Sequence, residues 1–138
     1  MTSTGRQCPT EDVEQQCLMR WAEYQSGKYP QLALLYHIPN GGKRGKAEAG
    51  RFRAMGVKSG VPDLCLPVPA GKWHGLYIEL KRQAGGRVEG NQEKWIQCLL
   101  AQGYAVEVAR GWEAAQKIIL DYLDGRYQPI YKAGRQRK

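Results

Sequence analysis

The sequence predicts a single α/β domain, because segments with helical periodicity alternate with short apolar runs that are typical of strands. Two of these runs flank a turn rich in glycine and proline, which predicts a β-hairpin. The length of 138 residues fits one domain, and 42% hydrophobic with 25% charged residues is the balance of a chain with one core. We therefore expect one domain over residues 1–125, followed by a basic tail over 126–138.

The first expected helix begins after Thr10, whose hydroxyl can cap it, and Gly27 and Pro30 end it. Acidic residues in its first turn favour this start, because they face the positive end of the helix dipole. Its expected apolar stripe consists of Val13, Cys17, Leu18, Trp21 and Tyr24. We expect this stripe to pack on the core.

Two elements separate this helix from the hairpin. The apolar run 32–38 is interpreted as a buried strand, closed by a flexible turn at 39–42. Residues 46–55 then predict a basic helix that ends near Gly56.

The hairpin is expected to join strands 63–68 and 75–81. If it folds about Gly71, the antiparallel register places Asp63 opposite Glu79, so that two carboxylates become neighbours. Pro67 indicates an edge or a strand end, because proline cannot donate to the ladder.

The last third of the chain predicts a helix, a strand and a second helix. Helix 92–102 carries one apolar face and leads through Gly103 into strand 104–109. The apolar face of that helix consists of Trp95, Ile96, Leu99 and Leu100. The final helix ends at Gly125, and its apolar stripe consists of Ala115, Ile118, Ile119 and Tyr122.

Basic residues are unevenly placed, which suits a polyanionic partner. The formal net charge is +8, and one segment with a single acid, Glu48, holds a concentrated share of it. The basic residues of that segment are Lys43, Arg44, Lys46, Arg51, Arg53 and Lys58, and those of the tail are Arg126, Lys132, Arg135, Arg137 and Lys138. Neutralising phosphates releases counterions and gives affinity without sequence specificity. A solubilising surface or a disordered tail explains charge alone equally well.

Other features restrict the class of protein. The longest apolar runs are too short to span a bilayer, and the start of the chain lacks the apolar segment of a signal peptide, so we expect a cytoplasmic protein without membrane contact. Four cysteines, at positions 8, 17, 65 and 98, lack the spacing of a structural zinc site, and we expect them to be reduced.

The residues with the clearest chemical potential lie on the hairpin. Glu79 and Lys81 are two apart on a strand and share a face, which Asp63 joins. Facing carboxylates repel each other unless a cation lies between them, and oxygen ligands with room for water suit Mg²⁺ or Mn²⁺. Such an ion would polarise a phosphodiester, while Lys81 would orient water or offset transition-state charge.

Each element alone is weak evidence. A glutamate two residues before a lysine is common, and an aspartate after proline is often only a turn residue. The conjunction of Asp63, Glu79 and Lys81 with a basic segment favours a nuclease over coincidence.

Further motifs extend this pattern over most of the chain. They are Glu14 on the first helix, the Pro-Asn-Gly-Gly turn 39–42, the segment 56–64, the segment 77–81 and Gln92. Their order and spacing resemble the VRR-NUC branch of the PD-(D/E)XK nuclease superfamily, in its compact stand-alone viral or bacterial type. The resemblance implies a restriction-endonuclease-like core, with a mixed β-sheet flanked by helices and Mg²⁺ or Mn²⁺ at its polar edge.

The resemblance also implies residue roles. Asp63, Glu79 and the Leu80 carbonyl would bind the metal, with Lys81 as the catalytic lysine and Gln92 as a polar active-site group. Glu14 borders the buried face of its helix and would reach the metal, although a carboxylate stabilised by the helix dipole is the alternative. The family often has Ser or Thr three residues before this glutamine, and here Glu89 stands there, which leaves the helix start open.

The expected substrate is branched or duplex DNA, held in part by Asn40 and the basic segment 43–58. Asn40 is equally well explained as a residue that stabilises its turn, and His37 and His74 are interpreted as a packed and a solvated histidine. Compact members of the family imply a homodimer that resolves four-way DNA junctions. The alternatives are a basic DNA-binding module without catalysis and a flap, nicking or restriction-type nuclease.

Overall fold

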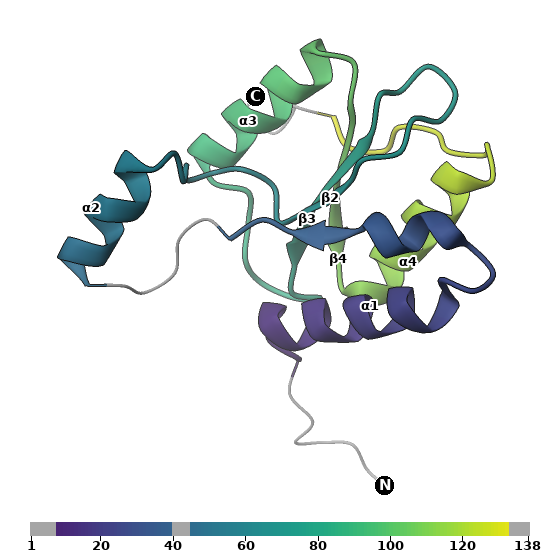
Figure 1. Ribbon diagram of the computed structural model, residues 1–138, viewed down its shortest axis with the longest axis horizontal. Coiled ribbons are helices and arrows are strands. Elements are labelled where there is room, and N and C mark those ends of the chain that lie inside the picture. Colours follow the sequence, from purple (N-terminus) through teal and green to yellow (C-terminus); the bar gives the residue numbers. More distant parts are fainter. Residues whose placement is uncertain (1–7, 40–44, 133–138) are drawn as a thin grey trace, which may run out of the picture.

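A mixed four-stranded sheet lies at the centre of the computed structural model, which describes residues 8–39 and 45–132 (Figure 1). Its strands are β1 (Tyr36–His37), β2 (Leu64–Leu66), β3 (Leu76–Lys81) and β4 (Ala105–Arg110). They lie in the order β1-β2-β3-β4. The first two pairs are antiparallel, and β3 and β4 are parallel. The predicted α/β class with a mixed sheet is therefore confirmed.

Helices cover both faces of this sheet. They are α1 (Glu11–Gln25), α2 (Lys46–Ala54), α3 (Gly90–Ala101) and α4 (Trp112–Leu123), with a 3-10 helix η1 (Pro30–Leu34). The helices α1 and α4 pack on one face and α3 packs on the other, whereas α2 stands away from the sheet (Figure 1). The parallel β3–β4 connection runs through α3, as crossovers between parallel strands require.

Alternation along β3 assigns its side chains to the two layers. Leu76, Ile78 and Leu80 are buried in the larger core with α1 and α4. Tyr77 packs in the smaller core with α3. Because side chains two apart share a face, Glu79 and Lys81 follow Tyr77 on the α3 side. The strand therefore separates an apolar layer from a face that ends in charged groups.

The hairpin has the predicted register. Leu64 pairs with Ile78, Cys65 with Tyr77 and Leu66 with Leu76. One further step along this register places Asp63 opposite Glu79. The strand β2 is shorter than predicted, because Pro67 follows Leu66 and cannot donate to a ladder.

Two expectations for the N-terminal third are wrong. Most of the run 32–38 is not a strand: η1 takes up its beginning, and β1 keeps only two exposed residues. Pro30 at the first position favours this turn, because its fixed φ is compatible with a helical start, and Leu32 and Leu35 are buried on successive turns.

The α1 stripe is also rotated from its predicted position. Thr10 caps the helix as predicted, accepting a hydrogen bond from the Val13 backbone N–H at 3.2 Å. Val13 and Tyr24 are nevertheless exposed. The buried residues are Glu14, Leu18 and Ala22. Glu14, predicted at the border of the buried face, lies within that face.

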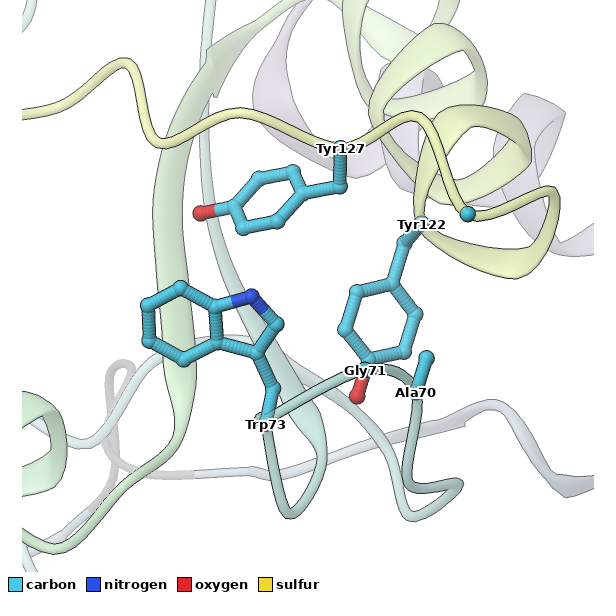
Figure 2. Close-up of a pocket in the computed structure, with 6 residues that line it drawn as sticks. Ala70, Gly71, Trp73, Tyr122 and Tyr127 are labelled. Carbon is cyan, nitrogen blue, oxygen red and sulfur yellow. The ribbon is translucent and has the colours of Figure 1, made fainter.

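The segment after α4 returns along the sheet edge. Tyr127 lies edge-to-face against Trp73 and Tyr122, and these three rings line a small pocket at the hairpin tip (Figure 2). The buried carboxylate of Glu107 accepts hydrogen bonds from the Tyr127 hydroxyl at 2.5 Å and the Tyr131 backbone N–H at 3.0 Å. The first residues of the segment 126–138 thus pack on the domain, and residues 133–138 lie outside the described ones.

Gly60 fits α3 so closely that a side chain there should destabilise the protein. Its φ is +92°, and an added Cβ would lie 2.7 Å from the backbone oxygen of Asn91. We expect Gly60→Ala to lower the free energy of unfolding by at least about 3 kcal/mol, measured by urea unfolding. Gly56→Ala is the matched control, because its φ is +104° but its Cβ would meet open space. It should cost only about 1–2 kcal/mol, and an equal loss in both variants would contradict the steric argument.

Candidate active site

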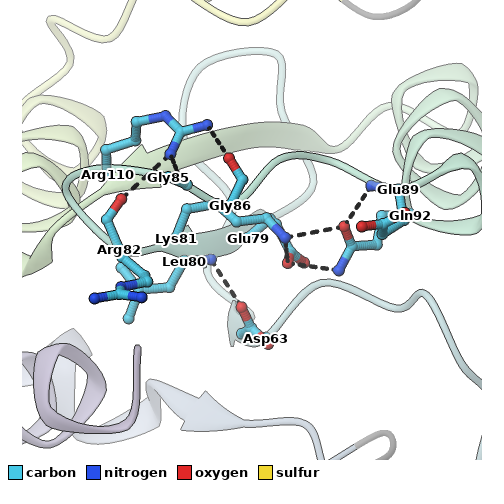
Figure 3. Close-up of polar contacts among 10 residues, drawn as sticks. All are labelled: Asp63, Glu79, Leu80, Lys81, Arg82, Gly85, Gly86, Glu89, Gln92 and Arg110. Carbon is cyan, nitrogen blue, oxygen red and sulfur yellow. Dashed lines mark hydrogen bonds and ion pairs between the residues drawn. The ribbon is translucent and has the colours of Figure 1, made fainter. Parts of the chain in front are cut away.

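Asp63 lies directly before β2, where its side chain reaches the neighbouring strand β3. Its Oδ2 accepts a hydrogen bond from the Leu80 backbone N–H at 2.8 Å (Figure 3). Its own carbonyl accepts one from the Ile38 backbone N–H at 2.7 Å. Hydrogen bonds from both sides therefore fix Asp63, one through its carboxylate and one through its backbone carbonyl.

Glu79 and Lys81 form a buried ion pair on β3. Lys81 Nζ lies 3.3 Å from Glu79 Oε2, and both side chains are less than a tenth exposed. A lysine held this way is withdrawn from water and kept in one place, which suits a group that must act on a substrate at a fixed position.

Gln92 joins these two residues from α3. Its Nε2 donates to Glu79 Oε2 at 2.9 Å, and its Oε1 accepts from Lys81 Nζ at 3.1 Å (Figure 3). The same Oε1 accepts from the Glu89 backbone N–H at 2.8 Å, closing the reciprocal bond of a capping box. Glu89 is thus the residue before the helix, and α3 begins two residues earlier than predicted, at Gly90.

Burial raises the pKa of both carboxyl groups of the site. Burial, and then the charge of Asp63, raise the pKa of Glu79 to about 8, against the opposing effect of Lys81. Burial also raises the pKa of Asp63, partly offset by the Leu80 hydrogen bond. Carboxyl groups whose pKa is raised by burial and by a neighbouring acid are typical of functional sites.

One oxygen of the cluster has no partner among the described residues. Glu79 Oε1 is buried and accepts no hydrogen bond from that part of the chain. Buried carboxylate oxygens are seldom left in this condition, because desolvation is costly. The atom therefore points to a ligand that supplies positive charge.

Known proteins support the same interpretation of the chain. The VRR-NUC domain family matches residues 9–113, about three quarters of the sequence. This chain belongs to the VRR-NUC domain family. A solved structure described as a VRR_NUC domain protein is 30% identical, with a TM-score of 0.74 over 92% of this chain and 99% of the other. No curated protein matched the sequence. Membership places the chain in a family of nucleases, as the resemblance implied.

Within this VRR-NUC domain, Glu14 and Glu11 occupy different surroundings. Glu14 is buried, and its oxygens accept hydrogen bonds from Gln83 Nε2 at 2.8 Å and the Trp112 backbone N–H at 2.9 Å. It therefore links α1 to the start of α4. Glu11, one turn earlier, is the acid whose charge raises the pKa of both Asp63 and Glu79. Sequence reasoning did not select Glu11, although it lies i−3 from Glu14 and shares that side of the helix.

His37 is a second residue that sequence reasoning left outside the site. It was expected to be packed, but it is exposed on β1, and its Nδ1 lies 2.9 Å from the Asp63 carbonyl oxygen. Its charge lowers the pKa of Asp63. The antiparallel β1–β2 pairing, which pairs His37 with Leu64, brings it there, and no sequence signal indicated that pairing.

The predicted DNA-binding residues that are described lie on α2 and on the loop that follows it. Lys46, Arg51, Arg53 and Lys58 are exposed on α2 and on the loop that leads to Asp63. All of α2 is described, and none of its residues is buried. Asn40, Lys43 and Arg44 lie outside the described residues. In the part of the chain that is described, no helix is long and apolar enough to cross a membrane.

The raised pKa of Glu79 predicts how stability depends on pH in the metal-free protein. An ordinary glutamate has a pKa of 4.5, whereas Glu79 in the folded protein has a pKa of about 8. Between these values the folded state binds a proton that the unfolded state has released, so the free energy of unfolding should fall as pH rises from about 5 to about 9. Urea unfolding in EDTA measures this dependence. Glu79→Gln keeps the shape and removes the titration, so its stability should change less over the same range, and identical slopes would contradict the assignment.

Proposed function

We propose that the protein is a Mg²⁺- or Mn²⁺-dependent endonuclease that hydrolyses phosphodiester bonds of DNA. The observation that carries this proposal is the meeting of Asp63, Glu79 and Lys81 at the same end of strands β2 and β3, where one Glu79 oxygen accepts no hydrogen bond from the described residues. Family membership supports the nuclease activity, and the chemistry of the cluster supports the metal dependence.

The donor set fits a hard divalent cation. Asp63, Glu79 and the Leu80 carbonyl would hold it, because each supplies an oxygen and the Leu80 backbone already contacts Asp63. The described residues contain no group of three or more acidic, histidine or cysteine side chains suited to a metal. A site with two carboxylates and one carbonyl leaves positions for water and phosphate, as Mg²⁺ sites in nucleases require.

Glu11 and Glu14 are alternative contributors from α1. The sequence prediction placed Glu14 among the ligands, but both of its oxygens already accept hydrogen bonds in the structure. Glu11 acts electrostatically on both site carboxylates. We therefore propose that Glu11 supplies the α1 carboxylate facing the cation, through water, and that Glu14 holds α1 against α4.

Lys81 and Gln92 would act beside the bound ion during hydrolysis. The bound ion would supply positive charge for the phosphate and make a nearby water more acidic. Lys81 would place its ammonium against the attacking water or a phosphate oxygen, stabilising charge as a water oxygen bonds to phosphorus and one P–O ester bond breaks. Gln92 would keep the Lys81 and Glu79 side chains in place through the two bonds that it makes to them.

The basic helix α2 and the loop that follows it would bind the DNA backbone. Arg51 and Arg53 are exposed on α2, which has no buried residue, and the loop after α2 carries Lys58 toward Asp63. Phosphate contacts of this kind give affinity without base reading and weaken steeply with salt. We propose that α2 and the loop hold the duplex whose backbone enters the site.

Metal dependence is the direct test of this function. We expect cleavage of linear and branched DNA in Mg²⁺ or Mn²⁺, weak cleavage in Ca²⁺, and none in excess EDTA, measured on labelled substrates. Mg²⁺ should also raise the melting temperature of the wild-type protein, by linkage, and should raise it much less in Glu79→Ala.

Three outcomes would contradict the proposal. Undiminished cutting in excess EDTA would exclude the metal, and a protein that binds DNA without cutting any member of the panel would be a binding module. An equal rise in melting temperature in Glu79→Ala would place the cation elsewhere.

A further inference from the structure

We propose that Arg110 is a positioning residue for the active site, one that holds the glycine-rich loop 82–89 so that Lys81 and Gln92 meet. The inference rests on the proposed function, because it concerns the same cluster. Arg110 is the last residue of β4 and is exposed, and neither hydrophobic periodicity nor a family motif singled it out.

The guanidinium of Arg110 binds three backbone carbonyls of this loop. One terminal nitrogen donates to Gly85 O at 2.6 Å and to Arg82 O at 3.3 Å, and the other donates to Gly86 O at 3.0 Å (Figure 3). Gly85 and Gly86 have φ of +78° and +64°. These left-handed conformations turn both carbonyls toward one centre, and they are readily adopted only by glycine.

The loop connects the two residues that the cluster must bring together. It begins directly after Lys81 and ends where Gln92 enters the first turn of α3. Arg110 also pairs with Lys81 in the parallel β3–β4 register, and the next backbone N–H, of Gly111, donates to the Lys81 carbonyl at 2.9 Å. The same strand end therefore fixes the start of the loop through its backbone and the middle of the loop through a side chain.

The middle of the loop also borders the acidic side of the site. An added Cβ on Gly86 would lie 3.8 Å from Glu11 Oε2 and 4.0 Å from the Lys81 side chain. Gln83, near the start of the loop, donates to Glu14. Displacement of the loop would therefore disturb the contacts of Lys81 with Gln92 and the approach of Glu11.

An eight-residue loop with two adjacent glycines has large conformational entropy when it is free. The three charge-assisted bonds from one rigid guanidinium oppose that entropy, and a lysine cannot reproduce their fork geometry. Because Arg110 lies on the surface, its loss should change the loop more than the core. A positioning role of Arg110 can therefore be tested without unfolding the protein.

The contrasting hypothesis is that Arg110 binds a DNA phosphate directly. Positioning predicts a lower kcat with little change in KM, because bound DNA would meet a misplaced cluster. Phosphate binding predicts a higher KM with kcat retained. The two hypotheses therefore differ in a single kinetic comparison.

We suggest measuring kcat and KM for Arg110→Ala and for Arg20→Ala, which removes the same charge from an exposed arginine on α1. For Arg110→Ala we expect kcat to fall at least about 10-fold with KM within about twofold, and for Arg20→Ala we expect both near wild type. Arg110→Lys should recover only a small part of the loss. Guanidinium chloride at about 10 mM should raise kcat in Arg110→Ala but not in wild type, since the free ion can occupy the same carbonyls.

Amide hydrogen exchange provides a readout that is independent of cleavage. Without metal or DNA, amides of residues 83–89 should exchange at least about 10-fold faster in Arg110→Ala, with α4 unchanged. Wild-type exchange in the loop, or a raised KM with full kcat, would overturn the inference. If wild type itself cuts no DNA, the proposed function fails, and the exchange result still decides whether Arg110 holds the loop.

Discussion

Asp63→Ala, Glu79→Ala and Lys81→Ala should each lower the cleavage rate at least about 100-fold, a rise of about 2.7 kcal/mol in the activation barrier. Each change removes a different part of one cluster. Loss of either carboxylate would remove a proposed ligand for the cation, and loss of Lys81 removes the ammonium held 3.3 Å from Glu79. Single-turnover cleavage of a labelled duplex at saturating Mg²⁺ measures the chemical step separately from binding and product release.

The surface supplies matched controls for these three variants. Lys117→Ala removes a lysine whose side chain is 77% exposed and that forms an ion pair with Asp121. Glu113→Ala removes an exposed carboxylate from the first turn of α4. Both should cut at rates near wild type, because exposed charges contribute little to the fold and lie outside the cluster. Near-wild-type cutting by Glu79→Ala would overturn the assignment of the site.

The three residues act as one unit, so their losses should not add. A double variant of Asp63 and Lys81 should be little slower than the worse of its two single variants. If the double variant instead lost the product of the two single rate reductions, the two residues would act in separate steps. Melting temperatures in EDTA separate these outcomes from unfolding, because the fold should survive each substitution.

The core of this site could be predicted because its geometry is local. Asp63 and Glu79 come from two strands of one hairpin, and the turn length determines their register. The alternation of β3 then places Lys81 on the same face as Glu79. The alternation of side chains along a strand and the length of a tight turn are sufficient to predict that these three residues meet, without knowledge of the rest of the fold.

The contacts that sequence reasoning missed are long-range. Glu14 is buried because Gln83 and Trp112, far along the chain, donate to it, whereas a helical wheel allowed it to face the metal. Arg110 acts on carbonyls, which carry no signal in the amino-acid sequence. The 3-10 helix at 30–34 replaced a strand because Pro30 begins it, and hydrophobicity alone did not distinguish the two.

The second large effect expected of this protein is paired cutting of four-way DNA junctions by a symmetric homodimer. One domain with one metal centre cuts one strand per encounter, whereas resolving a junction needs two coordinated cuts on opposing strands. A two-fold dimer supplies two such centres related by the symmetry of the junction. It would also double the positive surface of α2, which carries Arg51 and Arg53 and stands away from the sheet (Figure 1).

Mixing active and inactive subunits tests this prediction. When wild type is exchanged with nine parts of Lys81→Ala, about one dimer in a hundred has two active centres and about 18 in a hundred have one. Paired cuts in a cruciform plasmid, which give linear product, should therefore fall about 100-fold relative to the same total of wild-type protein. Single nicks should persist, and strand-specific labels distinguish the two products.

Paired cutting that falls only about 10-fold, in proportion to the wild-type share, would show that the centres act independently. A monomer by light scattering at micromolar concentration, or flap cutting that leaves junctions whole, would reject the dimer mechanism.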